Sequence, residues 1–136
     1  MMCLMLSDIM IWKYENALNE IHLEETVLKE WREGTRMGVL YLANHGDYFL
    51  KITDYKGQNS IHDFLYEYAY KFTCKILCQE RNISSLPRLE NEALQVYLMG
   101  STKYLMSWLK TMHLTPEEVA ELLCDCMPDL LKQYFG

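Results

Sequence analysis

The chain has few helix breakers, with three prolines and six glycines in 136 residues. Leu, Glu, Lys, Met and Tyr instead fill long segments in which apolar residues recur every three or four positions, and this pattern favours an all-helical fold. Half of the residues are apolar, which is enough to bury one sizeable core. We therefore expect a single all-α domain over residues 1–136.

Positive charge is also scarce, with 13 Lys and Arg against 19 Asp and Glu and a formal net charge of −6. Because nucleic acids attract proteins through excess positive charge, this balance argues against direct nucleic acid binding. The apolar N-terminal stretch MMCLMLSDIMIW is too short to span a bilayer and lacks the basic region of a signal peptide. The sequence thus predicts a cytoplasmic protein without a membrane partner, whose five cysteines are reduced thiols.

Motifs of catalysis are missing as well. The sequence has no nucleophile elbow, phosphate loop or HExxH motif, and its four histidines lie far apart. This predicts a protein without catalytic residues, cofactor or metal. One alternative stays open: Cys74 and Cys78 share a helix face, and Cys124 and Cys126 could meet them in a thiolate site. That arrangement would indicate a small helical thiol or metal sensor, or an enzyme.

Apolar periodicity predicts about six helices. The expected segments are residues 7–20, 24–44, a short one within 47–55, 60–80, 87–113, and 116–134. Gly46 is expected to end the second segment in a left-handed conformation. Pro128 is expected to kink or split the last one near Asp125, because proline cannot continue a helix.

The sharpest local signal is Thr115-Pro116-Glu117-Glu118. It supplies an N-cap hydroxyl, a proline at the first helical position and a glutamate at the third, so a helix must begin there. The helix before this turn carries an apolar stripe that is too wide for one neighbour. It also contains Gly100, which costs up to about 1 kcal/mol relative to alanine, so we expect a second helix to approach closely at that point.

These residues resemble the C-terminal domain of the TetR family of bacterial transcriptional repressors. The resemblance rests on the aromatic segment 104–108 followed by the helix start 115–120, and it is specific over residues 94–131. In that family the last two helices of each subunit form a dimeric four-helix bundle, and the preceding helices enclose a ligand pocket. The resemblance implies an effector-binding and dimerisation domain that takes a small, largely apolar molecule without catalysis.

Two departures from the family pattern stand out. The family's turn often carries a glycine after the aromatic segment, where this chain has Met112-His113. No helix-turn-helix with a basic recognition helix can be found before residue 24, so we expect this chain alone not to bind duplex DNA specifically.

The candidate ligand site is an aromatic-lined cavity between three helices, where small residues leave space and tyrosine hydroxyls orient a ligand. Its predicted lining is Trp31, Thr35, Gly38, Leu42, Phe64, Tyr68, Phe72, Tyr104 and Trp108. The same side chains could instead form a fully packed core. The alternative function is then a ligand-free helical interaction module that homo- or heterodimerises with a complete regulator.

A homodimer is the predicted partner state. The long helix is apolar beyond its core-facing stripe, and a monomer would leave those groups in water. A self-complementary patch closes with two copies. The predicted interface is Val96, Met99, Gly100, Lys103, Met106, Val119, Leu122, Leu123, Cys126, Met127 and Leu130.

Overall fold

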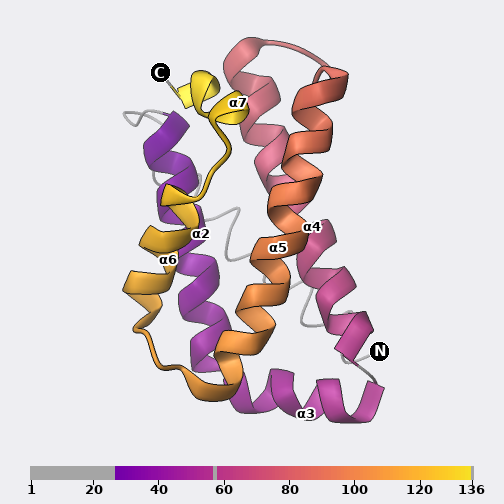
Figure 1. Cartoon of the computed structure of the whole chain (residues 1–136), viewed down its shortest axis with the longest axis vertical. Coiled ribbons are helices and arrows are strands. Elements are labelled where there is room, and N and C mark those ends of the chain that lie inside the picture. The colour runs from indigo at the N-terminus through magenta and orange to yellow at the C-terminus, as the bar shows by residue number, and fades with distance from the viewer. Residues whose placement is uncertain (1–26, 57, 136) are drawn as a thin grey trace.

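The computed structural model describes residues 27–56 and 58–135 (Figure 1). These residues form six α-helices and a terminal 3-10 helix and contain no β-strand, so the all-helical prediction is confirmed. The elements are α2 (Val27–Asn44), α3 (Gly46–Lys56), α4 (Gln58–Arg81), α5 (Arg88–Thr111), α6 (Pro116–Asp125), α7 (Asp129–Lys132) and η1 (Gln133–Phe135). The helix expected over 7–20 lies outside the described residues.

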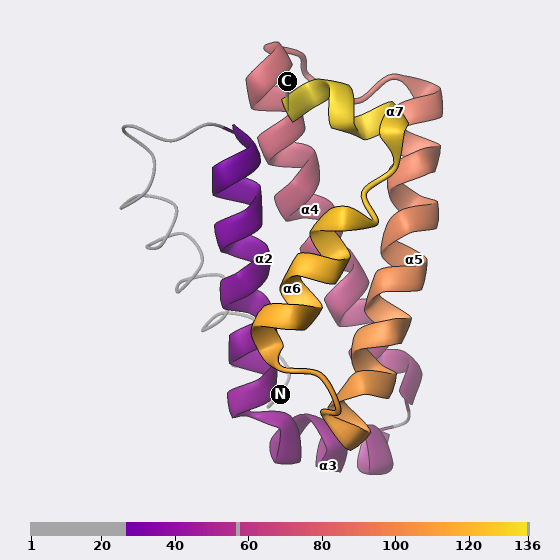
Figure 2. The same ribbon diagram turned by 60° about the vertical axis from the view of Figure 1, so that its left-hand side comes forward.

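Three long helices, α2, α4 and α5, run along the length of the bundle (Figure 1). Helix α3 crosses one end of the bundle, and α7 lies at the opposite end. Helix α6 packs mainly on α2, whereas α5 packs mainly on α4. Figure 2 shows α6 in front of the long helices, between α2 and α5. The chain between residues 88 and 125 therefore returns along the bundle and covers one side of it.

The turn before α6 has the geometry that its sequence predicts. The Glu118 amide donates to Oγ1 of Thr115 at 3.1 Å, and the Thr115 amide donates to Oε1 of Glu118 at 3.0 Å. This reciprocal pair is a capping box, and it satisfies two amides that the first turn of a helix otherwise leaves unpaired. Helix α6 ends at Asp125 and α7 begins at Asp129, after Pro128. The predicted interruption of the last segment is thus confirmed.

Two turns show what sequence reasoning could not resolve. Met112 ends α5 in the left-handed conformation, with φ 49° and ψ 41°, and its amide donates to the Trp108 carbonyl at 2.6 Å. A non-glycine residue therefore takes the position for which glycine is favoured. The expectation for Gly46 was wrong: His45 alone makes the turn after α2, and Gly46 is the first residue of α3. The amide of Phe49 bonds the His45 carbonyl at 3.1 Å, so α3 starts at once and needs no left-handed residue.

The interior consists of two apolar clusters. The first surrounds α3 and the end of α5, and its most buried members are Phe49, Met106, Trp108 and Val119. The second lies toward α7 and joins Leu77, Leu94 and Leu131 to Trp31. Short side chains lie between these clusters, and the candidate site is found there.

Candidate functional site

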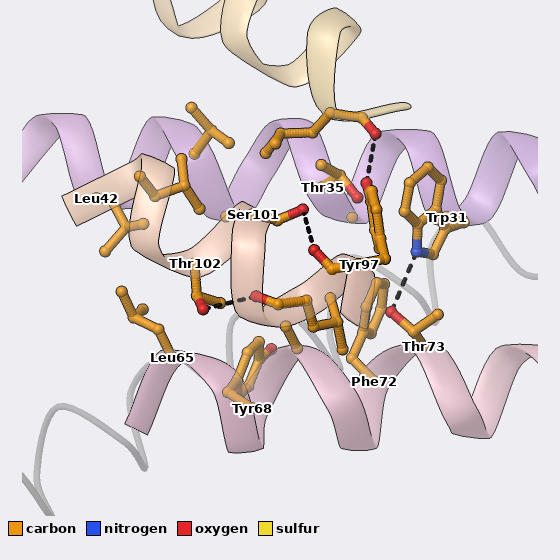
Figure 3. Close-up of a pocket in the computed structure, with 17 residues that line it drawn as sticks. Trp31, Thr35, Leu42, Leu65, Tyr68, Phe72, Thr73, Tyr97, Ser101 and Thr102 are labelled. Atoms are coloured by element: carbon orange, nitrogen blue, oxygen red, sulfur yellow. Dashed lines mark hydrogen bonds between the residues drawn. The ribbon is translucent and has the colours of Figure 1, made fainter. Parts of the chain in front are cut away.

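A cavity of about 80 Å³ lies at the junction of the two core clusters (Figure 3). Its walls are formed by α2, α4 and α5, and Leu123 of α6 closes one side. Its lining takes Val39 and Leu105 from the first cluster, and Trp31 and Leu98 from the second. The cavity therefore separates two packed regions of one interior.

The space exists because small residues meet at this level of the bundle. Gly34 and Gly38 of α2, Ala69 of α4 and Ser101 of α5 all line it. At Gly34 the reason for glycine is direct, because a Cβ there would overlap the tip of the Phe72 ring. Helices α2 and α4 can thus approach closely at Gly34.

Six of the nine residues predicted to form a ligand site do line this cavity. They are Trp31, Thr35, Gly38, Leu42, Tyr68 and Phe72. Leu65, Tyr97 and Thr102 join them although the sequence did not single them out for the site. One feature of the sequence could have pointed to this part of α5: two adjacent hydroxyl residues, Ser101 and Thr102, lie in a mostly apolar segment.

The other three predicted residues do not reach the cavity. Phe64 and Tyr104 are partly exposed and pack against the first core cluster. Trp108 is 1% exposed and lies near the end of α5, where its indole N–H donates to the Leu114 carbonyl at 2.9 Å. Trp108 therefore holds the α5–α6 turn in place and does not line this cavity.

The polar groups of the cavity are mostly engaged in internal hydrogen bonds. Trp31 Nε1 donates to Thr73 Oγ1 at 3.2 Å, and the Tyr97 hydroxyl donates to the Leu123 carbonyl (Figure 3). Burial raises the pKa of Tyr97 well above its ordinary value, so this phenol stays neutral. The hydroxyl of Thr35 forms no hydrogen bond within the part of the chain that the structure describes.

Two hydroxyls of α5 also bond the backbone of their own helix. Ser101 Oγ donates to the Tyr97 carbonyl at 2.8 Å, and Thr102 Oγ1 donates to the Leu98 carbonyl at 2.6 Å. His62 Nε2 lies 3.0 Å from Thr102 Oγ1 on the side of α4. Because a hydroxyl has one proton and two lone pairs, Ser101 keeps an acceptor for another group.

The outer face of α5 is a second feature of the molecule. We use this name for Leu89, Val96, Met99, Gly100 and Lys103, whose spacing places them on one side of the helix. Leu89, Val96 and Met99 are 64%, 73% and 53% exposed. No atom of the described chain lies within 4 Å of the position that a Cβ on Gly100 would take. An apolar strip of this kind normally marks an interaction surface.

The predicted dimer interface divides into two groups in the structure. Val96, Met99, Gly100, Lys103, Leu122, Cys126 and Leu130 are exposed. Met106, Val119, Leu123 and Met127 are 1%, 0%, 7% and 3% exposed, because they pack inside the subunit. Within the subunit these four side chains therefore belong to the core, and their place at an interface stays a prediction: periodicity assigns a residue to an apolar face but does not say which neighbour covers it.

The cysteines lie in different surroundings. Cys124 is buried, Cys74 and Cys78 are partly exposed, and Cys126 is exposed. Burial raises the pKa of Cys124 to about 11 and also raises that of Cys74. In residues 27–56 and 58–135 no three His, Cys, Asp or Glu side chains gather as metal ligands. Within the same ranges, no helix has the length and apolar character needed to cross a membrane.

The described part of the chain is an all-helical bundle, and comparison with protein families assigns its class. Residues 29–129 match the TetR-type family described as "Transcriptional regulator C-terminal region". Since the match covers most of the chain, the protein belongs to this family, which confirms the resemblance drawn from its sequence. Comparisons with curated proteins and with solved structures gave no match.

Proposed function

We propose that this chain is the effector-binding and dimerisation domain of a TetR-like transcriptional regulator, and that it binds a small, largely apolar molecule without catalysis. The carrying observation is the cavity between the two core clusters, in a chain that belongs to a family of regulator C-terminal regions. A regulator of this kind works where bacterial DNA is, so the proposal places it in the cytoplasm.

The size of the cavity limits the effector. Drug-sized ligands occupy pockets of roughly 300–1,000 Å³, whereas this cavity measures about 80 Å³. An engineered cavity of about 150 Å³ is known to hold benzene. The effector is thus a compact molecule, and it gains room when the partly exposed side chains of Tyr68 and Phe72 shift outward.

A second copy of the chain is the proposed occupant of the outer face of α5. The face is apolar at three of its five positions and extends over about four turns of the helix. Gly100 leaves open space where a partner helix can approach closely. Two copies related by a two-fold axis would bury the same patch on both subunits and would leave no patch free for further growth.

One helix connects the two features. Ser101 and Thr102 face the cavity, while the neighbouring Gly100 and Lys103 lie on the outer face. A ligand that moves α5 by a fraction of its diameter would therefore move the interface with it. If the ligand binds one position of α5 more tightly than another, its binding shifts the equilibrium between these two positions.

A thermal-shift experiment with a library of small apolar compounds tests the ligand-binding part. A hit should raise the melting temperature in proportion to RT ln(1 + [L]/Kd), about 2.7 kcal/mol of stabilisation at a hundredfold excess over Kd. Ser101→Leu fills the cavity and should abolish the shift. Ser107→Leu makes the same change at an exposed position of α5 and should preserve it. Equal shifts in both variants, or no hit at all, would contradict ligand binding in this cavity.

A ligand-free interaction module is the second candidate, and two observations favour it. The cavity is small, and the most exposed large apolar side chain in the described ranges is Val96 of the outer face. This function predicts a stable dimer, or a heterodimer with a complete regulator, together with no response to the library. Dimerisation without any thermal shift would select it over effector binding.

A further inference from the structure

The cavity contains no charged side chain. Among the described residues that line it, none is Lys, Arg, His, Asp or Glu. The two arginines of α2 are committed elsewhere, since Arg32 pairs with Glu121 at 3.2 Å and Arg36 pairs with Glu33. A charged ligand would lose its hydration here without gaining a counter-charge, which costs several kcal/mol. The site therefore selects against ions.

Several protons of the cavity's polar groups are already used within the chain. The hydroxyl proton of Ser101 is held by the Tyr97 carbonyl, and that of Thr102 by the Leu98 carbonyl. The indole N–H of Trp31 is held by Thr73. Lone pairs of Ser101 are left for a ligand, and the hydroxyl of Thr35 can accept or donate. A ligand with one hydroxyl group can donate to Ser101 and accept from Thr35 without breaking any internal bond.

Shape narrows the ligand further. Side chains of Tyr68 and Phe72 enter the cavity from α4 (Figure 3), and Gly34 and Gly38 of α2 also line it. A planar ring can stack on this aromatic wall, and it fits beside residues without bulky side chains better than a branched chain of equal volume does. The cavity of about 80 Å³ is about half the volume of one known to hold benzene, so one ring is the upper limit and needs the outward shift of Tyr68 and Phe72.

We propose that the cavity recognises a neutral single-ring molecule carrying one hydrogen-bond donor, of the phenol class, with its O–H donating to Ser101 Oγ. This inference rests on the proposed function, because it names the ligand class of the same site. The ring lies beside Tyr68 and Phe72, and Thr35 provides a second contact for the hydroxyl oxygen or its proton.

Fluorine NMR titration of the full chain tests this with three probes of similar size at neutral pH. These are para-fluorophenol as the neutral donor, para-fluorotoluene as the apolar analogue and para-fluorobenzoate as the anion. We expect para-fluorophenol to bind about tenfold more tightly than para-fluorotoluene, the factor that one additional hydrogen bond provides. We expect para-fluorobenzoate to bind more weakly than either.

Variants separate the hydroxyl contact from the apolar contact. Ser101→Ala should lower the affinity for para-fluorophenol about tenfold and leave that for para-fluorotoluene unchanged. Thr35→Val, which keeps the side-chain shape, should lower the para-fluorophenol affinity in the same sense, and Ser107→Ala on the exposed side of α5 should change neither. Equal binding of para-fluorophenol and para-fluorotoluene, or preferred binding of para-fluorobenzoate, would overturn the inference and leave the proposed function standing. Absence of binding by all three probes would overturn both.

Discussion

The two faces of α5 carry the same kind of residue and have opposite surroundings. On the inner face Leu94 and Leu98 are 0% and 4% exposed, whereas on the outer face Val96 and Met99 are 73% and 53% exposed. Burying an apolar side chain of this size is worth about 1.5–3 kcal/mol. The inner residues obtain this stabilisation within one subunit, whereas residues 27–56 and 58–135 leave the outer residues uncovered, so a partner could supply it. The difference shows that one side of a helix can pack in the core of its own subunit while the other side is available to a partner.

Truncation at the end of the inner face should produce the largest effect. Trp108→Ala removes a side chain that is 1% exposed and its hydrogen bond to Leu114. We expect it to lower the free energy of unfolding by about 3–5 kcal/mol, the usual cost of deleting a buried aromatic side chain. Urea denaturation followed by circular dichroism measures this loss. Lys110→Ala, exposed in the same turn, should stay within about 0.5 kcal/mol of wild type, and similar losses for both variants would show that the interior is not packed at Trp108.

The same substitution at two glycines contrasts the interior with the outer face. Gly34→Ala forces the Phe72 ring to move and should cost about 1–3 kcal/mol through overpacking. Gly100→Ala meets no atom within 4 Å and should leave the stability of the separated subunit unchanged or slightly raised, because alanine favours a helix. Thermal melts at low protein concentration compare the two. If Gly100→Ala lowered the stability and Gly34→Ala did not, Gly100 would be the packed position and Gly34 the open one, which would contradict this account.

Removing the cap of α6 should have a smaller effect. Thr115→Ala eliminates the hydroxyl that accepts from the Glu118 amide and should cost about 1 kcal/mol. Helix α6 supplies Leu123 to the cavity and exposes Leu122 on its other side. A frayed first turn would therefore disturb the cavity wall and the exposed side of α6 together. Denaturant unfolding checks the value, with Ser107→Ala as the control. A Thr115→Ala protein as stable as wild type would mean that the capping box contributes nothing to the fold.

The least drastic perturbation is alkaline pH, and the comparison is between the buried Cys124 in α6 and the exposed Cys126 just after this helix. Burial raises the pKa of Cys124 from 9.0 to about 11. Between these values the unfolded chain loses the thiol proton while the folded chain keeps it, so stability falls as pH rises. Cys124→Ala should reduce this slope, leaving a remainder from Tyr97, whose pKa is also raised. Cys126→Ala, at an exposed position, should leave the slope of the unfolding free energy in place; an unchanged slope in Cys124→Ala would contradict the assignment.

The sequence predicted local structure more reliably than it predicted surroundings. The start of α6 at Thr115 and the break before Pro128 follow from groups a few residues apart, and both are present. Whether Met106 faces the core or a partner depends on packing between distant segments, which periodicity does not contain. The position of Trp108 also depends on packing, because its indole N–H bonds the Leu114 carbonyl across a turn. Met112 in a left-handed conformation gave no local signal at all.

For the candidate site, sequence reasoning found some of the large residues and, among the small ones, Thr35 and Gly38 but not the others. Trp31 and Phe72 were visible as aromatics on helix faces, while Gly34 and Ala69 drew no attention although they leave the space. A cavity is the volume that the neighbouring side chains leave unfilled, and this volume is fixed only when the helices pack together. Small residues facing one another at the same level of a bundle are the signal to search for.

The most direct test of the account is the mass of the chain in solution, measured by sedimentation equilibrium at micromolar concentration. The subunit mass is 16.2 kDa, and a second copy seated on the outer face of α5 predicts a species of twice that mass. Val96→Glu places a charge at the most exposed apolar position and should give a monomer with an unchanged helical spectrum, whereas Lys29→Glu on α2 should remain dimeric. A wild-type chain that sediments at 16.2 kDa throughout this range would contradict the central claim.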